Sequence, residues 1–152
     1  MIELKNITRV YATGKVNVRA LDGVNLTIRE GEYVAIMGQS GSGKSTLLNI
    51  LGFLDKPDSG QYLFCGRDIT GLSDDQLSTL RNRVAGFVFQ QFHLLPKLSA
   101  AQNAALPMVY SGKRDTDAVS KARLADVGLA ARAAHLPGEL SGGEQQRVAI
   151  AR

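Results

Sequence analysis

The chain has 152 residues, of which 44% are hydrophobic and 21% are charged, a composition typical of a globular domain and not of a disordered segment. Its 18 basic residues exceed its 14 acidic ones, but no block of like charges marks a nucleic-acid face. No uncharged stretch approaches the roughly 20 apolar residues that cross a bilayer, and the N-terminal residues lack the pattern of a secretory signal, so we expect a cytosolic protein.

The first third of the chain is predicted to form β-strands. Ile2 and Leu4 alternate with charged residues, and residues 24–28 alternate between apolar and polar, which is typical of half-buried antiparallel strands. Turns are expected at Thr13 and Gly14, at Asp22 and Gly23, and at Glu30 and Gly31. The continuous apolar run of residues 33–37 then predicts a strand buried on both faces.

A glycine-rich loop is expected directly after this buried strand. Residues 38–43 form the predicted loop, and residues 45–54 carry apolar side chains at helical spacing, with Pro57 just beyond them. A turn at residues 58–60 leads into a short predicted strand at residues 61–64. The single cysteine, Cys65, has no partner for an internal disulfide, and we expect a buried thiol.

Three capping boxes, each a serine followed three residues later by Gln or Glu, mark helix starts in the rest of the chain. They lie at Ser73 and Gln76, Ser99 and Gln102, and Ser141 and Glu144. The first helix should end near Arg83, before a second buried strand at residues 86–89, and the second helix should break near Pro107. Residues 116–127 predict a helix stopped by Gly128, and the last helix should run to the end of the chain.

The glycine-rich loop carries the most specific chemical pattern. Residues 38–45 match G-x-x-x-x-G-K-[ST], in which small residues let backbone N–H groups turn inward around phosphate oxygens. The helix that begins there adds its positive dipole end. Lys44 is expected to contact the β- and γ-phosphates and the Ser45 hydroxyl to bind Mg²⁺. The alternative is a glycine-rich turn without a ligand.

Three weaker features each allow two interpretations. Gly142 and Gly143, in the first turn of a helix capped by Ser141, form either a second anion site or an ordinary loop-to-helix junction. Gln90, at the end of the second apolar strand, either reaches Mg²⁺ or the attacking water, or is a solvated polar residue. Tyr11 either stacks on a nucleobase or belongs to the core.

Taken together in this order, these features resemble the ATP-binding subunit of ABC transporters, whose signature is the run LSGGEQQRV. Over essentially the whole chain, the likeness is to the branch that serves lipoprotein release and macrolide or peptide efflux. The stretches that carry this likeness are AIMGQSGSGKSTLLNILGFLDKPDSG, GFVFQQFHLLP and LPMVYSG.

The resemblance implies an α/β fold, a P-loop NTPase core of the ABC ATPase type, with an N-terminal antiparallel β subdomain and an α-helical subdomain. The C-terminal part of the core sheet is expected to be missing. Residues 1–152 would then be an N-terminal fragment of the ABC ATPase domain. Within it, the resemblance implies a β subdomain with the Walker A core at 1–71, a Q-loop strand region at 72–90 and a helical subdomain at 91–152 that ends in the signature helix.

The resemblance also implies residue roles. Tyr11 would stack on adenine, and Gln90, in the Q-loop, would contact Mg²⁺ and couple the site to a partner. The nucleotide-binding residues it implies are Tyr11, Gly38, Gln39, Ser40, Gly41, Ser42, Gly43, Lys44, Ser45, Thr46 and Gln90, with Ser45 and Gln90 as metal ligands. The signature residues it implies at the γ-phosphate bound by another subunit are Ser141, Gly142, Gly143, Glu144 and Gln145.

The function implied by the resemblance is coupling of ATP binding and hydrolysis to an integral membrane permease, with ATP and Mg²⁺ as cofactors. A second ATP-binding subunit would complete a head-to-tail dimer on the inner face of the cell membrane, without nucleic acid. In the family, a Walker B aspartate, a catalytic glutamate and a switch histidine follow the signature helix. We therefore expect no catalytic residue and no ATP hydrolysis within these 152 residues alone. The alternatives are a soluble ABC ATPase without a transport role and an inactive truncated product.

Overall fold

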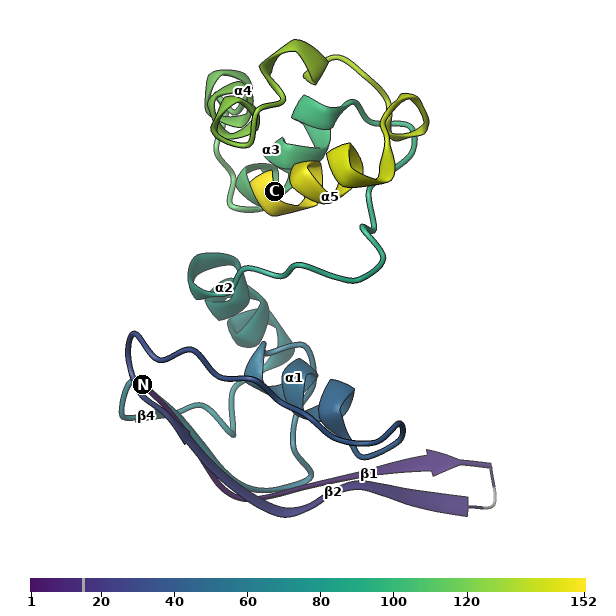
Figure 1. Ribbon diagram of the computed structural model, residues 1–152. Helices are drawn as coiled ribbons and strands as arrows, with labels where there is room; N and C mark the ends of the chain where they lie inside the picture. The colour runs from purple at the N-terminus through teal and green to yellow at the C-terminus, as the bar shows by residue number, and fades with distance from the viewer. Residues whose placement is uncertain (15) are drawn as a thin grey trace. The chain divides into compact units, whose positions relative to one another are not determined.

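An antiparallel sheet with the strand order β2-β1-β3-β4 organises the first half of the chain (Figure 1). The computed structural model describes residues 1–14 and 16–152. The strands are β1 (Ile2–Thr13), β2 (Val16–Ile28), β3 (Ser59–Phe64) and β4 (Arg67–Asp68). The chain divides into two units, Met1–Ala85 and Gly86–Arg152, which are described separately. The expected antiparallel β subdomain is confirmed in the first unit.

The β1–β2 hairpin contains a bulge where the sequence predicts a turn. The turn expected at Asp22 and Gly23 is wrong, because β2 runs through both residues. Gly23 has a φ of 60°, and its N–H donates to Thr8 Oγ1 at 3.2 Å, while the register of the pairing shifts between Ile7 and Arg9. A glycine in the left-handed region lets the strand bulge and continue.

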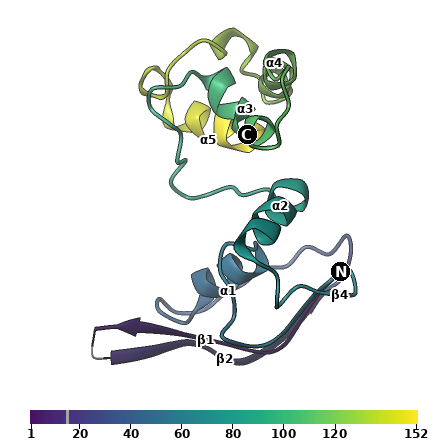
Figure 2. The ribbon, with the colours of Figure 1, turned by 180° about the vertical axis from the view of Figure 1, so that it is seen from behind.

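Two helices, α1 (Lys44–Leu51) and α2 (Asp74–Val84), lie on the same side of the β1–β2 hairpin (Figures 1 and 2). Phe53 stacks on Tyr62 with ring centroids 5.6 Å apart, and Arg81 Nη1 donates to the Phe53 carbonyl oxygen at 2.6 Å. The buried core consists of Leu4, Ile7, Leu21, Ile50, Phe53, Tyr62, Ile69 and Leu77. Each large side chain buried here contributes about 1.5–3 kcal/mol.

The first helix is shorter than its apolar pattern predicts. It ends at Leu51, and not at Leu54, because Phe53 adopts a φ of 61°. This left-handed residue turns the chain so that the Leu54 N–H donates to the Asn49 carbonyl oxygen at 2.8 Å, which closes the helix end. The strand predicted at residues 61–64 also starts earlier, at Ser59.

The two buried strands predicted at residues 33–37 and 86–89 are wrong, since both segments are irregular. Tyr33 is 96% exposed, Met37 is 88% exposed and Val88 is 59% exposed. A strand buried on both faces needs a paired strand at its edge and packed layers above and below it. Within the described residues, no strand pairs with either segment. Phe87 and Phe89 stack on each other with ring centroids 5.6 Å apart, but in the described part of the chain neither segment gains the paired strands that its composition favours.

This exposure predicts a contrast between two core-like substitutions. Met37→Ala should change the free energy of unfolding by less than ~0.5 kcal/mol, because its side chain is already in water. Ile50→Ala, at a position that is 0% exposed, should cost about 2–5 kcal/mol. Urea unfolding followed by circular dichroism measures both values. A loss at Met37→Ala as large as that at Ile50→Ala would show that residues 33–37 are packed.

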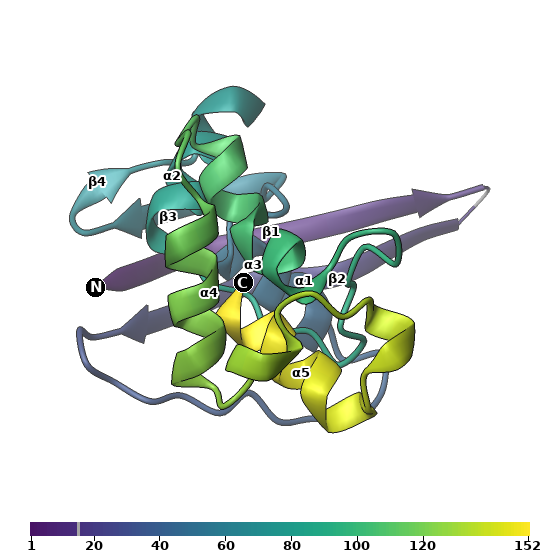
Figure 3. The ribbon, with the colours of Figure 1, turned by 90° about the horizontal axis from the view of Figure 1, so that it is seen from above.

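The second unit is helical (Figure 3). Its elements are α3 (Ala100–Tyr110), α4 (Asp117–Asp126), the 3₁₀ turns η1 (Ala130–Arg132) and η2 (Pro137–Glu139), and α5 (Gly142–Ala151). Its core consists of Ala100, Ala101, Ala104, Leu124, Leu129, Leu140 and Val148. Asn103 is fully buried among them, where its amide donates to the carbonyl oxygens of Leu95 and Leu98 and its Oδ1 accepts from the Leu95 N–H. The buried amide thus fixes the segment that precedes α3.

Helix starts are predicted better than helix interiors. The capping boxes that begin α2, α3 and α5 are all confirmed, with the serine hydroxyl accepting from the backbone N–H three residues later. The break expected near Pro107 is wrong, because α3 continues to Tyr110. Pro107 lies in the last turn, where its missing N–H removes only one helical bond, and the Ser111 N–H still donates to the Pro107 carbonyl oxygen.

Cys65 is exposed in the turn between β3 and β4, so the expectation of a buried thiol is wrong. Its φ of 49° lies in the left-handed region, as in a tight turn. None of the helices in the described part of the chain is long and apolar enough to cross a membrane.

Candidate functional site

The glycine-rich loop of residues 38–43 leads directly into α1, as the pattern predicts. Gly43 precedes the helix with a φ of 85°, and a Cβ atom there would lie 2.2 Å from the Ala20 carbonyl oxygen of β2. Gly41 has a φ of 81°. Glycine therefore lets the loop turn into the helix while its backbone rests directly on the hairpin.

The Lys44 ammonium group folds back over this loop. Nζ donates to the carbonyl oxygens of Gly38 at 2.9 Å and Gln39 at 2.6 Å, and to Ser42 Oγ at 3.4 Å. A lysine held in this way can exchange carbonyl oxygens for phosphate oxygens without leaving the loop. The first turn of α1 contains no acidic residue, so an anion at the helix N-terminus meets no like charge there.

The first turn of α1 presents backbone donors and a hydroxyl. The first bond within the helix joins the Leu47 N–H to the Gly43 carbonyl oxygen at 2.9 Å, which leaves the N–H groups of Lys44, Ser45 and Thr46 directed out of the helix end. Ser45 is exposed, and its hydroxyl is the hard oxygen ligand that Mg²⁺ takes beside water and phosphate. No group of three or more His, Cys, Asp or Glu among the described residues could hold a metal by itself. These residues fit a Mg²⁺ ion held mainly by nucleotide phosphates.

Tyr11 lies on β1 opposite Val18, half-buried and outside the buried core. Its hydroxyl donates to Asp55 Oδ2 at 2.6 Å, and the Arg9 guanidinium carbon lies 4.8 Å from the centre of its ring. Asp58 is held nearby by Arg9 and by the Val10 N–H, and the bond from that N–H lowers the pKa of the Asp58 carboxyl. The ring is therefore fixed at the edge of the hairpin on which the loop rests.

Arg9 and Asp55 belong to none of the motifs found in the sequence. Arg9 lies two residues before Tyr11 in a predicted strand, a spacing that places both side chains on one face and is a usable signal. Asp55 has no comparable signal, because its contact with Tyr11 joins residues 44 positions apart.

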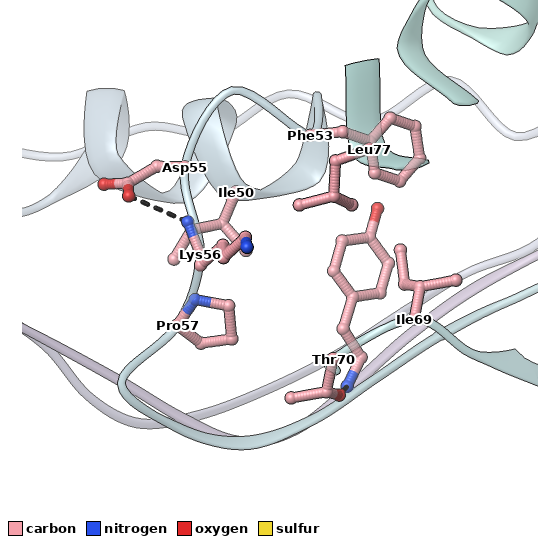
Figure 4. A pocket seen from close by; sticks show the side chains of 9 residues that line it. Ile50, Phe53, Asp55, Lys56, Pro57, Ile69, Thr70 and Leu77 are labelled. Atoms are coloured by element: carbon pink, nitrogen blue, oxygen red, sulfur yellow. Dashed lines mark hydrogen bonds between the residues drawn. The ribbon is translucent and has the colours of Figure 1, made fainter. Parts of the chain in front are cut away.

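A small hollow beside Asp55 is lined by Ile50, Phe53, Lys56 and Leu77, among others (Figure 4). The Lys56 N–H donates to Asp55 Oδ1 at 2.8 Å at its rim. The cavity volume is about 10 Å³, which is room for about one water molecule. It is too small to hold a nucleotide.

The signature residues begin α5 in the second unit. Ser141 Oγ accepts from the Glu144 N–H at 3.3 Å and donates to Glu144 Oε2 at 2.8 Å. The Ser141 N–H also donates to that carboxylate, Arg132 Nε binds its other oxygen at 3.2 Å, and these contacts lower the pKa of Glu144. Gly142 and Gly143 are exposed in the first turn, and Gln145 Nε2 donates to the Leu140 carbonyl oxygen at 3.1 Å. The helix N-terminus is open to solvent beside this capping box.

The structure divides the predicted site residues between its two units. Tyr11, Gly38, Gln39, Ser40, Gly41, Ser42, Gly43, Lys44, Ser45 and Thr46 lie in Met1–Ala85, and Gln90, Ser141, Gly142, Gly143, Glu144 and Gln145 lie in Gly86–Arg152. Within the first unit, Tyr11 is part of the β1–β2 hairpin, and the loop rests on the same hairpin through Gly43. Gln90 is exposed on an irregular segment and does not end a strand as predicted.

A glycine-rich loop that delivers a lysine, a hydroxyl and free N–H groups to one helix N-terminus defines a P-loop protein. The chain belongs to the ABC transporter family: the family model with the description "ABC transporter" matches residues 21–152.

Relatives with related names match the whole chain. It is 59% identical to the macrolide export ATP-binding/permease protein MacB of Chlorobaculum tepidum and spans 24% of that protein's length. It is 53% identical to the uncharacterized ABC transporter ATP-binding protein YknY of Bacillus subtilis, spanning 67% of it, and 51% identical to the lipoprotein-releasing system ATP-binding protein LolD of Geobacter metallireducens, spanning 68% of it.

Solved structures of the same kind share the fold. The dimeric ATP-binding cassette MJ0796, in a post-hydrolysis state with ADP and Pi, superimposes with a TM-score of 0.89 at 45% identity. The comparison covers 99% of this chain and 68% of that one. The fold is therefore that of an ABC ATPase cassette over the length compared.

Proposed function

We propose that this chain binds Mg-ATP at residues 38–46 and belongs to the ATP-binding part of an ABC transporter of the export or lipoprotein-release type. The observation that carries the proposal is the Lys44 ammonium group, held by the carbonyl oxygens of Gly38 and Gln39 at the open N-terminus of α1. The names of the relatives, macrolide export and lipoprotein release, support the transport type.

In this proposal, the loop N–H groups and Lys44 neutralise the β- and γ-phosphates, while Tyr11 stacks on adenine. Ser45 and Gln90 would hold Mg²⁺, which offsets phosphate charge when it is bound. Residues 1–71 would form the β subdomain with the nucleotide loop, residues 72–90 the Q-loop region and residues 91–152 the helical subdomain.

A second subunit completes the proposed site. The exposed first turn of α5, with Ser141, Gly142, Gly143, Glu144 and Gln145, would bind the γ-phosphate of a nucleotide held by another copy in a head-to-tail dimer. Two helix N-termini from two chains would then clamp one triphosphate. The dimeric structures of MJ0796 support this arrangement.

An integral membrane permease is the proposed partner, and the inner face of the cell membrane the proposed location. Support comes from the name of the MacB relative, which combines ATP-binding and permease parts. We expect affinity-tagged protein to co-purify with an integral membrane protein after detergent extraction. Co-purification with RNA or DNA in its place would favour a soluble ABC ATPase without a transport role.

Calorimetric titration of the 152-residue chain with Mg-ATP tests the nucleotide site. We expect one ATP per chain and no phosphate release above background, because the resemblance places the catalytic glutamate beyond the signature helix. Absence of ATP binding would overturn the proposal. Robust phosphate release would contradict the expectation that these 152 residues alone do not hydrolyse ATP.

A further inference from the structure

Four side chains connect the first strand to the segment that follows α1. Arg9 binds the Asp55 carboxylate through Nε at 3.1 Å and Nη2 at 2.9 Å, and binds Asp58 through Nη1 at 2.6 Å. The Tyr11 hydroxyl donates to Asp55 Oδ2 at 2.6 Å. We call Arg9, Tyr11, Asp55 and Asp58 the Arg9 network.

The network is tighter than a surface ion pair. The Arg9 and Asp55 side chains are each 22% exposed, and Arg9 engages both oxygens of Asp55 in the bidentate geometry that fixes orientation as well as charge. The Lys56 N–H also donates to Asp55 Oδ1, the oxygen that Arg9 Nη2 binds, at 2.8 Å. These contacts fix the Asp55 carboxylate independently of its hydrogen bond with the Tyr11 hydroxyl.

Asp55 and Arg9 together fix the Tyr11 ring. The hydrogen bond to Asp55 restrains rotation of the ring at its hydroxyl end. The Arg9 guanidinium carbon lies 4.8 Å from the ring centre and covers one of its faces. A flat ligand can then stack only on the opposite face, and Tyr11 remains partly exposed.

The β1–β2 hairpin positions both the Tyr11 ring and the phosphate-binding loop. Gly43, at the start of α1, rests against the Ala20 carbonyl of β2, and Tyr11 pairs with Val18, two residues along that strand. Two residues of strand span about 7 Å. Asp55 follows α1 in sequence, so the network joins the ring to the helix whose N-terminus carries Lys44.

We infer that Asp55 and Arg9 are positioning residues that hold Tyr11 for stacking on a nucleobase. Neither side chain needs to touch the ligand. This inference rests on the proposed function, because it assumes that a nucleotide places its phosphates at residues 38–46. It assigns the base-dependent part of the affinity to a tyrosine that is preorganised by an ion pair.

The test compares ligands with and without a base. In the 152-residue chain, Tyr11→Phe keeps the ring but removes the bond to Asp55, and Asp55→Asn keeps the shape but weakens both contacts. We expect each variant to weaken Mg-ATP binding about 3- to 10-fold, as for one lost hydrogen bond, and to leave Mg-tripolyphosphate binding within about twofold. The double variant should bind ATP as tightly as whichever single variant binds it less tightly, since both substitutions affect the same Tyr11–Asp55 hydrogen bond.

Matched controls separate positioning from general stability. Asp126→Asn removes an exposed aspartate paired with Arg123, and Tyr110→Phe alters a tyrosine that is 81% exposed; both should leave the ratio of the two affinities unchanged. Equal loss of ATP and tripolyphosphate binding in Tyr11→Phe would overturn the inference without contradicting the proposed nucleotide site of the wild-type chain. Unchanged ATP binding in Tyr11→Phe and Asp55→Asn would do the same. A wild-type chain that binds neither ligand would overturn the proposed function as well.

Discussion

A Lys44→Ala variant is expected to bind Mg-ATP about 10- to 100-fold more weakly than the wild type, the loss typical of a hydrogen-bonded charge facing an anion. Nζ already lies among the oxygens of Gly38, Gln39 and Ser42, so its position needs little rearrangement to meet phosphate. Removing it leaves the helix dipole and N–H groups as the remaining attraction. Equilibrium titration of the 152-residue chain measures the change.

A second lysine provides the control for Lys44→Ala. Lys121 is exposed and binds Asp117 at 2.7 Å on α4, so Lys121→Ala removes one positive charge outside the loop. Its ATP affinity should match that of the wild type. Lys44→Met keeps the aliphatic stem and should lose as much affinity as Lys44→Ala if charge is what matters. ATP binding by both Lys44 variants within twofold of wild type would refute the role of Lys44 in phosphate binding.

The loop is predictable because its information is local. Residues 38–45 specify their own turn through Gly41 and Gly43, and the apolar residues that follow specify a helix. The capping boxes at Ser73, Ser99 and Ser141 succeed for the same reason, since each closes within three residues.

The strand predictions at residues 33–37 and 86–89 are wrong because a buried strand forms only where neighbouring strands and layers are present. Their composition is that of strands with both faces covered, but edge pairing and covering layers come from other parts of a sheet. In the described residues, the sheet contains β1 to β4 and neither segment. Sequence pattern alone reports the preference of a segment and not the presence of its partners.

The Arg9 network could not be predicted for a related reason. Arg9 and Asp55 are 46 positions apart, and their contact depends on where α1 ends, which the apolar pattern places three residues too late. The left-handed conformation of Phe53 shortens the helix and turns residues 54–58 toward β1. A side-chain contact that depends on such a turn appears only once the backbone is known.

Gly43→Ala is expected to destabilise the first unit by about 3 kcal/mol or more and to abolish ATP binding. Two effects add. A φ of 85° costs an alanine about 1–2 kcal/mol, and its Cβ would lie 2.2 Å from the Ala20 carbonyl oxygen, a backbone atom that cannot rotate away. Relief requires the loop to separate from β2, which moves the N-terminus of α1 together with Lys44. Urea unfolding and ATP titration of the same sample measure both consequences.

Two other glycines isolate the contribution of the close contact. Gly41 and Gly31 have φ values of 81° and 75°, and nothing lies within 4 Å of a Cβ atom at either position. Their alanine variants should therefore lose only the conformational cost of about 1–2 kcal/mol. Gly31→Ala should also keep wild-type ATP affinity, since it lies outside the loop. If Gly43→Ala is no less stable than Gly41→Ala, the loop does not depend on close packing against β2, and its glycines act only through backbone conformation.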